Sequence, residues 1–150
     1  MRLALALAAE AEKTGDVPVG AVIMDENGAV IGRGRNRREA RRSAVSHAEI
    51  EAIEEACRAR GSWRLDGCTL FVTLEPCPMC AGAVINARIP TLVYGAKEPV
   101  TGSCGSVLNL FEERYGFRPA IYGGVLAEEC AAILRDFFRT VRIQNTDETA

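Results

Sequence analysis

Three residues of this chain have the types and the spacing of metal ligands. Cys77 and Cys80 are three residues apart in the run LEPCPMCAG, and His47 is the only histidine. Proline is tolerated in the first turn of a helix, so Pro78 indicates that both sulfurs lie at a helix start, whose positive end favours thiolates. Zinc prefers thiolate and imidazole ligands. The three residues therefore predict a zinc site with its fourth position open to water.

Glu49 lies two residues after His47 in the run HAEIEA. On an ideal helix that offset corresponds to about 200°, so the two side chains are not expected to bind one metal from mid-helix. Near a helix start, the carboxylate can instead lie beside the metal without binding it. Zinc lowers the pKa of a bound water to about 7, and a free carboxylate can then move its proton. Glu49 is the expected proton shuttle.

Two other interpretations of the cysteine pair are open at this point. A Cys-x-x-Cys pair at a helix start can be a redox centre, although His47 and Glu49 argue against that reading. A closed structural zinc site would need a fourth protein ligand and would make Glu49 incidental. The candidates for that ligand are the remaining cysteines, Cys57, Cys68, Cys104 and Cys130. Otherwise these four thiols are expected to behave as small buried hydrophobes.

The elements that must position these residues can be predicted from periodicity and turn signals. Helical spacing and stop signals predict helices over residues 2–14, 47–60, 78–87, 106–115 and 126–142. Apolar runs and the Asn27-Gly28 turn predict strands over residues 17–24, 29–33, 68–74, 92–94 and 120–123. The segment between the second strand and residue 47 is expected to be a loop. Alternating helices and strands imply an α/β fold, with a mostly parallel sheet opened by one antiparallel hairpin.

Length and composition predict one globular domain over residues 1–150, with a frayed tail after about residue 144. The chain is 48% hydrophobic and 25% charged, and no apolar run approaches the roughly 20 residues of a membrane helix. A Cys-x-x-Cys pair without signs of secretion is typical of an intracellular protein. We therefore expect a cytoplasmic protein that does not bind membranes.

Arginines gather in two places, although the net charge of the chain is only −2. Six lie within residues 33–42, just before His47, and three more lie within residues 135–142. A charge run is most often a solvated face, but a basic patch can also contact phosphates. By residue type, Trp63 and the pair Phe137-Phe138 favour core positions over base-stacking positions.

His-x-Glu followed by Pro-Cys-x-x-Cys resembles the signature of the zinc-dependent cytidine and deoxycytidylate deaminase superfamily, whose members act on nucleobases and nucleosides. Within it, nearly the whole chain resembles the bacterial tRNA-specific adenosine deaminases. The matching segments are residues 17–21, Asn36, 47–50, 61–65, 69–83, 103–106 and 137–139. The resemblance implies a three-layer αβα fold of the cytidine-deaminase type, with a five-stranded sheet and helices on both faces. It also implies a homodimer with one Zn²⁺ ion per subunit.

The reaction implied by the resemblance converts the wobble adenosine of a tRNA anticodon loop to inosine. In that reaction zinc-bound hydroxide attacks C6 of adenine and ammonia leaves. His47, Cys77 and Cys80 would hold the zinc ion, and Glu49 would carry the protons. The resemblance also assigns substrate contacts to five residues, of which Asn36 could by type alone equally be a turn former. They are Asn36, Val19, Leu74, Ala48 and Pro76.

Contacts to the tRNA are expected from the two arginine groups, the loop after residue 95 and the last helix. The candidates are Arg35, Arg37, Arg38, Lys97, Phe138, Arg139 and Arg142. Two alternative functions remain open: deamination of a free guanine or cytosine compound, and a non-catalytic zinc module that binds tRNA. A module has no use for a carboxylate at Glu49, and a small-molecule deaminase has no need of the arginines.

Overall fold

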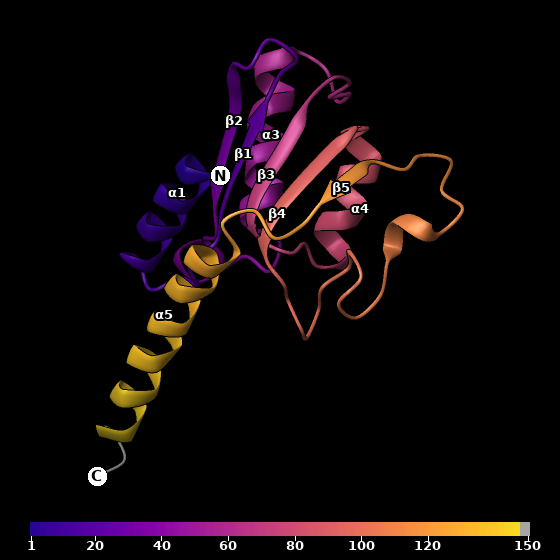
Figure 1. Ribbon diagram of the computed structural model, residues 1–150. Helices are drawn as coiled ribbons and strands as arrows, with labels where there is room; N and C mark the ends of the chain where they lie inside the picture. The colour runs from indigo at the N-terminus through magenta and orange to yellow at the C-terminus, as the bar shows by residue number, and fades with distance from the viewer. Residues whose placement is uncertain (148–150) are drawn as a thin grey trace.

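Five strands form one sheet at the centre of the protein (Figure 1). A computed structural model describes the backbone of residues 1–147 and the side chains of residues 1–144. The strands are β1 (Gly20–Met24), β2 (Val30–Arg35), β3 (Thr69–Leu74), β4 (Thr91–Ala96) and β5 (Ala120–Tyr122), in the order β2-β1-β3-β4-β5. β1 is antiparallel to both of its neighbours, whereas β3, β4 and β5 are parallel. The predicted mostly parallel sheet with one antiparallel hairpin is confirmed.

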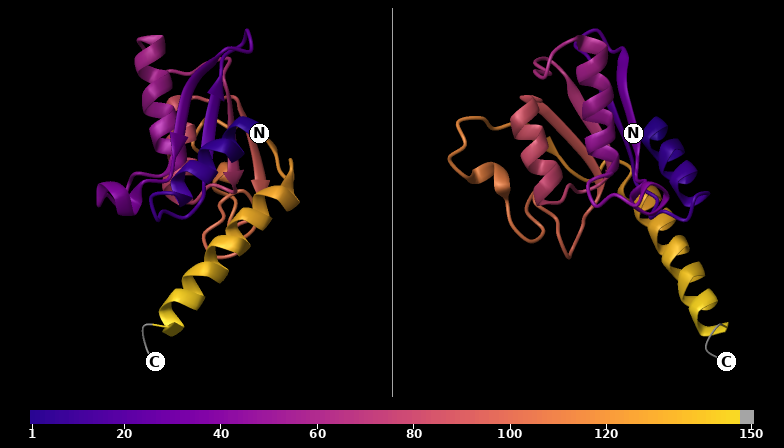
Figure 2. Two further views of the ribbon diagram at one scale, coloured as in Figure 1. Left: turned by 90° about the vertical axis from the view of Figure 1, so that its left-hand side faces the viewer. Right: turned by 180° about the vertical axis from the view of Figure 1, so that it is seen from behind.

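Helices cover both faces of this sheet and complete the predicted αβα layers (Figure 2). α3 (Ala48–Arg60) and α4 (Pro78–Ala87) lie on one face, and α1 (Arg2–Glu12) lies on the other with the start of α5 (Ala127–Asp147). The rest of α5 extends beyond the sheet as a projecting rod. Within the described part of the chain, no helix has the length and apolar character that crossing a membrane requires.

The core lies between the sheet and its helices. Fully buried side chains from neighbouring strands, such as Ile23, Leu70 and Leu92, form its centre. Burying a side chain of this size contributes roughly 1.5–3 kcal/mol, so a few such residues from adjacent strands determine which face of each strand points inward. The carboxyl end of β3 then leads directly into the cysteine motif, because α4 begins four residues after Leu74.

The position of α3 depends on two glycines of the edge strand β2. A Cβ atom at Gly34 would lie 2.0 Å from the carbonyl oxygen of Ala48 and 2.6 Å from the amide nitrogen of Ala52. A Cβ atom at Gly32 would lie 2.2 Å from the carbonyl oxygen of Ala52. Helix backbone and strand backbone are therefore in direct contact. This contact determines where α3 begins, and the first zinc-ligand candidate stands at that point.

The predicted helix over residues 106–115 is wrong. The segment contains only the 3₁₀ turn η1 (Leu110–Glu112). The residue before it, Asn109, caps this turn, since its side chain accepts a hydrogen bond from the Phe111 amide at 3.2 Å. The amides that would bond within such a helix have other acceptors: that of Leu110 bonds the Ser103 carbonyl, and that of Phe111 bonds the Asn109 side chain. The apolar periodicity of the segment instead reflects the anchoring of the buried Phe111 in the core.

A short helix, α2 (Arg38–Arg41), stands where the sequence analysis expected only a loop. Its start is capped from a distance by Asp16, a fully buried residue. The Asp16 carboxylate accepts hydrogen bonds from the amides of Glu39 at 2.7 Å and Ala40 at 3.3 Å. An acidic group at a helix start satisfies free amides and complements the helix dipole. This cap fixes the arginine-rich segment against the connection between α1 and β1.

Several predicted boundaries also shift. β1 begins at Gly20 rather than residue 17, and β2 covers Val30–Arg35 rather than residues 29–33. α5 continues to Asp147 instead of ending near residue 142, so the expected fraying after residue 144 is not found over residues 145–147. The last three residues lie outside the described part. Trp63 was expected in the core but is 61% exposed, with the Arg64 guanidinium 5.3 Å from its ring centre.

Candidate metal centre and active site

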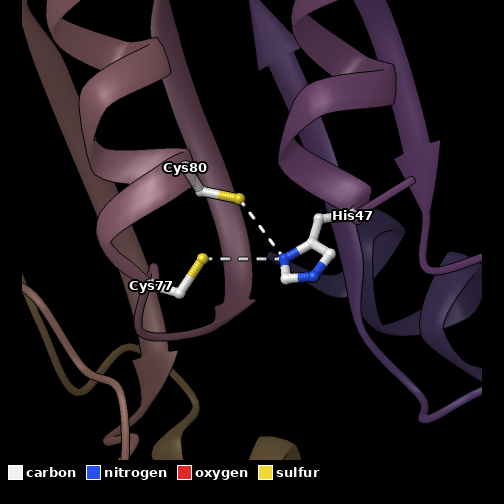
Figure 3. A group of neighbouring side chains, drawn as sticks. All are labelled: His47, Cys77 and Cys80. Carbon is white, nitrogen blue, oxygen red and sulfur yellow. Dashed lines mark hydrogen bonds between the residues drawn. The ribbon is translucent and has the colours of Figure 1, made fainter. Parts of the chain in front are cut away.

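The three predicted ligands converge between the starts of two helices (Figure 3). His47 is the residue just before α3, Cys77 is the residue just before α4, and both have extended backbone. Pro78 occupies the first turn of α4, as predicted, and Cys80 follows one turn into the helix. The two helix starts lie side by side because α3 and α4 pack on the same face of the sheet.

The distances between the ligand atoms match a tetrahedral zinc site. The Nδ1 atom of His47 lies 3.7 Å from the Sγ atom of Cys77 and 3.5 Å from that of Cys80. Zinc bonds of about 2.0–2.1 Å to nitrogen and about 2.3 Å to sulfur, at a tetrahedral angle, put these atoms about 3.6 Å apart. Among the described residues these three form the one group of this kind, and no other cysteine joins it. The donor set fits zinc with three protein ligands.

The two thiols differ in their protonation. A hydrogen bond from Cys80 and the nearby His47 lower the pKa of Cys77 to about 4, despite its partial burial. The same hydrogen bond, together with burial, raises the pKa of Cys80. The shared hydrogen bond therefore favours the thiolate form of Cys77 and the protonated form of Cys80. Because zinc requires both sulfurs as thiolates, metal binding releases the proton of Cys80.

Glu49 lies beside the metal centre but outside the ligand group. Its side chain is 4% exposed, and this burial raises the pKa of the carboxyl group above its ordinary value. His47, its own backbone amide and the Cys80 thiol favour the ionised form, but their effect is smaller than that of burial. Glu49 therefore shares the pocket with His47 and Cys77 without belonging to the group of ligand candidates.

A pocket of about 230 Å³ opens onto this centre. Four of the five predicted substrate contacts line it, namely Asn36, Val19, Leu74 and Ala48. The fifth, Pro76, is buried behind the pocket, where its carbonyl oxygen accepts a hydrogen bond from the Ser103 amide at 2.9 Å. Lining residues that the sequence analysis did not assign to the substrate pocket are Val17, Arg38, Glu75, Glu98, Thr101 and Phe138.

The side chain of Asn36 is held in place by hydrogen bonds to two backbone groups. Its side-chain amide nitrogen donates to the Val17 carbonyl at 3.1 Å, and its side-chain oxygen accepts from the Arg38 amide at 3.3 Å. An asparagine side chain offers two N–H donors and two acceptor lone pairs. One donor and one lone pair therefore remain for a molecule in the pocket. The turn-forming role and the base-contacting role that the sequence left open are compatible.

Most of the arginines expected to contact RNA are held in ion pairs. Arg35 pairs with Glu10 at 2.6 Å, and Arg37 pairs at 2.9 Å with the buried Glu51. Arg139 of α5 pairs with Asp136 at 2.9 Å. Of the expected RNA contacts, Arg38 and Phe138 line the pocket itself. Lys97 and Arg142 are exposed, on the loop after β4 and on α5 respectively.

Comparison with known proteins gives the class that this fold and centre define. The chain matches the MafB19-like deaminase family over residues 1–142, and it belongs to that family. It is 48% identical over 143 residues to the tRNA-specific adenosine deaminase of Bacillus subtilis. The match covers 95% of this chain and 88% of the relative. The resemblance inferred from the motifs is confirmed.

Two solved structures share the fold. One, described as a study of A-to-I editing by tRNA:A34 deaminases at the wobble position, superposes with a TM-score of 0.85. The two sequences are 43% identical, and the match covers 89% of this chain and 97% of the chain in that structure. The other is a guanine deaminase from Nitrosomonas europaea, with a TM-score of 0.79 and 26% identity over 91% of this chain and 81% of that one. The fold is thus shared by deaminases of different substrates.

Proposed function

We propose that the protein hydrolyses the wobble adenosine of tRNA to inosine and ammonia. The observation that carries this proposal is a pocket in which three zinc-ligand candidates and the buried Glu49 meet. The substrate follows from similarity, since the chain is 48% identical to a tRNA-specific adenosine deaminase in a match that covers 95% of its length. The position of Glu49 also argues against a zinc module without catalysis.

The protein's residues divide the reaction between them. His47, Cys77 and Cys80 would hold the zinc ion, which supplies Lewis acidity that makes water a stronger acid and a better nucleophile. Glu49 accepts the proton of the attacking water and passes it to N1 of adenine. Glu49 then takes the remaining proton from the hydroxyl group now attached to C6 and delivers it to the amino nitrogen. The bond between C6 and that nitrogen breaks, the C6 carbonyl forms, and ammonia leaves. A carboxyl group whose pKa is raised by burial suits both steps, since it must take up and return protons.

The size of the pocket favours a single extruded base. Pockets for drug-sized ligands measure about 300–1,000 Å³, and this one measures about 230 Å³. Val19 and Leu74 offer apolar surface to the faces of a base, and Asn36 retains one donor and one acceptor for its edge. Enzymes that modify a base either act on a single strand or rotate the nucleotide out of its stack. An anticodon loop presents such a base.

We propose that the rim of the pocket contacts the RNA on either side of that base. Arg38 can contact a phosphate, and Phe138 can stack on a neighbouring base, as aromatic residues do in single-strand recognition. Lys97, Arg139 and Arg142 extend the basic surface. Arg35, Arg37 and Arg139 are engaged with acidic partners and are expected to contribute less.

We further propose that residues 1–150 form one deaminase domain that acts in the cytoplasm. On the strength of the resemblance, the working enzyme is a homodimer with one zinc ion per subunit. Light scattering at working concentration should give twice the mass of the chain. A monomeric mass would contradict the proposed assembly and leave the proposed chemistry untouched.

The central test is to incubate zinc-loaded protein with an anticodon stem-loop RNA that carries adenosine at the wobble position. Nucleoside analysis should find inosine at that position in the parent protein and none with Glu49→Ala. Free guanine and cytidine, assayed in parallel for ammonia, test the small-molecule alternative that the guanine deaminase fold suggests. Ammonia from a free base, with no inosine from an RNA that binds, would overturn the proposed substrate.

A further inference from the structure

A second buried glutamate, Glu75, lies at the end of β3, immediately before the cysteine motif. Its side chain is 2% exposed and is surrounded by the loop of residues 97–106. One carboxylate oxygen accepts hydrogen bonds from the amides of Cys104 at 2.9 Å and Ser106 at 3.1 Å. The other accepts from the Glu98 amide at 3.0 Å and from the Ser106 hydroxyl. Four donors from one loop therefore converge on a single carboxylate.

This arrangement requires a group that only accepts hydrogen bonds. An ionised carboxylate has two oxygens and no donor, so it can satisfy all four groups. A glutamine of the same shape would point an NH₂ group at two of these donors. Charge-assisted bonds to backbone amides are also stronger than neutral ones. The chemistry of the loop's donors therefore specifies a carboxylate at position 75.

The loop also packs directly against the carboxylate. A Cβ atom at Gly102 would lie 2.6 Å from a Glu75 carboxylate oxygen and 2.3 Å from the Glu98 carbonyl oxygen. The Gly102 amide donates to that same carbonyl at 3.0 Å, which closes the turn. Only glycine leaves room for this approach. The loop and the carboxylate are thus matched to each other in shape as well as in hydrogen bonding.

The clamped loop forms part of the pocket wall. Glu98 and Thr101 line the pocket together with Glu49, and the Glu98 amide is one of the four donors to Glu75. The Ser103 amide bonds the Pro76 carbonyl at 2.9 Å, which ties the loop to the turn that presents Cys77. The backbone of Glu75 leads into the turn that carries Cys77, and its side chain binds the loop that forms the wall of the pocket. Glu75 therefore links the two.

We propose that Glu75 is a positioning residue that holds residues 97–106 as a preformed wall of the substrate pocket, so that the RNA binds without having to order this loop. The proposal deepens the proposed function and rests on it for the identity of the substrate. Both carboxylate oxygens of Glu75 are engaged by the donors of the loop, so its role is to hold the loop in place. Its loss makes substrate binding carry the entropic cost of ordering the loop. The effect is therefore on KM more than on kcat.

The test compares Glu75→Gln with Glu113→Gln, the same change at an exposed glutamate. In Glu75→Gln, KM for the stem-loop RNA should rise about tenfold or more, since two charge-assisted bonds are lost. The value of kcat should fall less, and zinc content should stay at one per chain. Hydrogen exchange should accelerate at the amides of Glu98, Cys104 and Ser106, and remain unchanged in β3. Glu113→Gln should match the parent in every measurement.

A milder variant covers the case in which Glu75→Gln does not fold. Ser106→Ala removes one of the four donors, and it should raise KM and loop exchange in the same direction by a smaller factor. Unchanged exchange and unchanged KM in these variants would overturn the proposal. Loss of zinc with kcat would also overturn it, because Glu75 would then support the metal turn instead. If the parent makes no inosine, the proposed function fails, while the exchange measurement still tests the clamp.

Discussion

Glu49 and Glu75 border the same pocket and are buried to nearly the same extent, at 4% and 2% exposure. Burial raises the pKa of Glu49, and its hydrogen bonds do not reverse that effect. Burial also acts to raise the pKa of Glu75, but the Ser106 hydroxyl and three backbone amides outweigh it, and the pKa lies below its ordinary value. One carboxyl group is suited to exchange protons and the other to remain charged. The two roles are separated by the four donors around Glu75 and by the stronger effect of burial on the pKa of Glu49.

The largest expected effect on activity and stability comes from removing the zinc ion, without which Glu49 has no activated water to deprotonate. Cys80→Ala should lose zinc and all inosine formation. It should also lose about 3 kcal/mol of stability, or roughly 6–12 °C in Tm, because zinc stabilises only the folded chain. Metal analysis and calorimetry check this result. Adding a chelator to the parent protein should lower Tm by a similar amount. If the chelator lowered the Tm of Cys80→Ala as well, this result would contradict the assignment of Cys80 as a zinc ligand.

Glu49→Gln separates the proton shuttle from the metal centre. Turnover should fall by about 10²–10⁴-fold, the usual contribution of a general acid–base group. Zinc content and Tm should not fall, since the substitution removes a buried ionisable group whose charged form burial disfavours. Single-turnover assays with stem-loop RNA and metal analysis measure both quantities. Activity equal to that of the parent would sink the mechanism.

Gly102→Ala acts on the Glu75 side of the comparison alone. The added methyl group would lie 2.6 Å from the carboxylate, and such overpacking typically costs about 1–3 kcal/mol. KM for the RNA should rise while zinc stays bound. Gly82→Ala is the matched control, because nothing lies within 4 Å of its Cβ position on α4. It should be neutral or stabilise by about 0.4–1 kcal/mol. Equal urea midpoints for both variants would argue against a tight clamp.

A third buried acid, Glu51, extends the comparison between Glu49 and Glu75. Removing one of its two ion-pair partners should have the smallest effect of the four substitutions. Glu51 is ion-paired with Arg37 at 2.9 Å and with Arg41 at 3.0 Å, both partly exposed. Arg41→Ala should cost less than about 1 kcal/mol, because Arg37 still neutralises the carboxylate and exposed pairs contribute little. Urea denaturation should register this change, and RNA turnover should not. A loss of turnover would indicate that Arg41 contacts the substrate.

The sequence predicted what depends on local pattern and missed what depends on distant partners. The ligands His47, Cys77 and Cys80 were predictable because the motif and the helix starts are local, and the sheet because its apolar runs are local. The helix expected over 106–115 is absent because the Leu110 amide bonds the Ser103 carbonyl instead of the Ser106 carbonyl. The loop that contains Ser103 is held by Glu75, about thirty residues earlier in the chain, through the amides of Cys104 and Ser106.

The same explanation holds for the short helix α2, which the sequence analysis did not predict. Its cap is the Asp16 carboxylate, 23 residues before Glu39. Neither Asp16 nor Glu75 carries a local signal of its role, since an isolated acid in a sequence is typically a surface residue. Both acids became recognisable only when the fold brought backbone donors to them.

The contact between β2 and α3 makes the metal centre dependent on two positions that have no side chain. The edge strand carries Gly32 and Gly34 where backbone touches backbone, and α3 starts directly after the zinc-ligand candidate His47. A methyl group at either glycine would force the helix and strand apart, and the histidine would move relative to the two cysteines of α4. In a mutational scan for activity, residues 32 and 34 should therefore tolerate substitution as poorly as the ligands themselves.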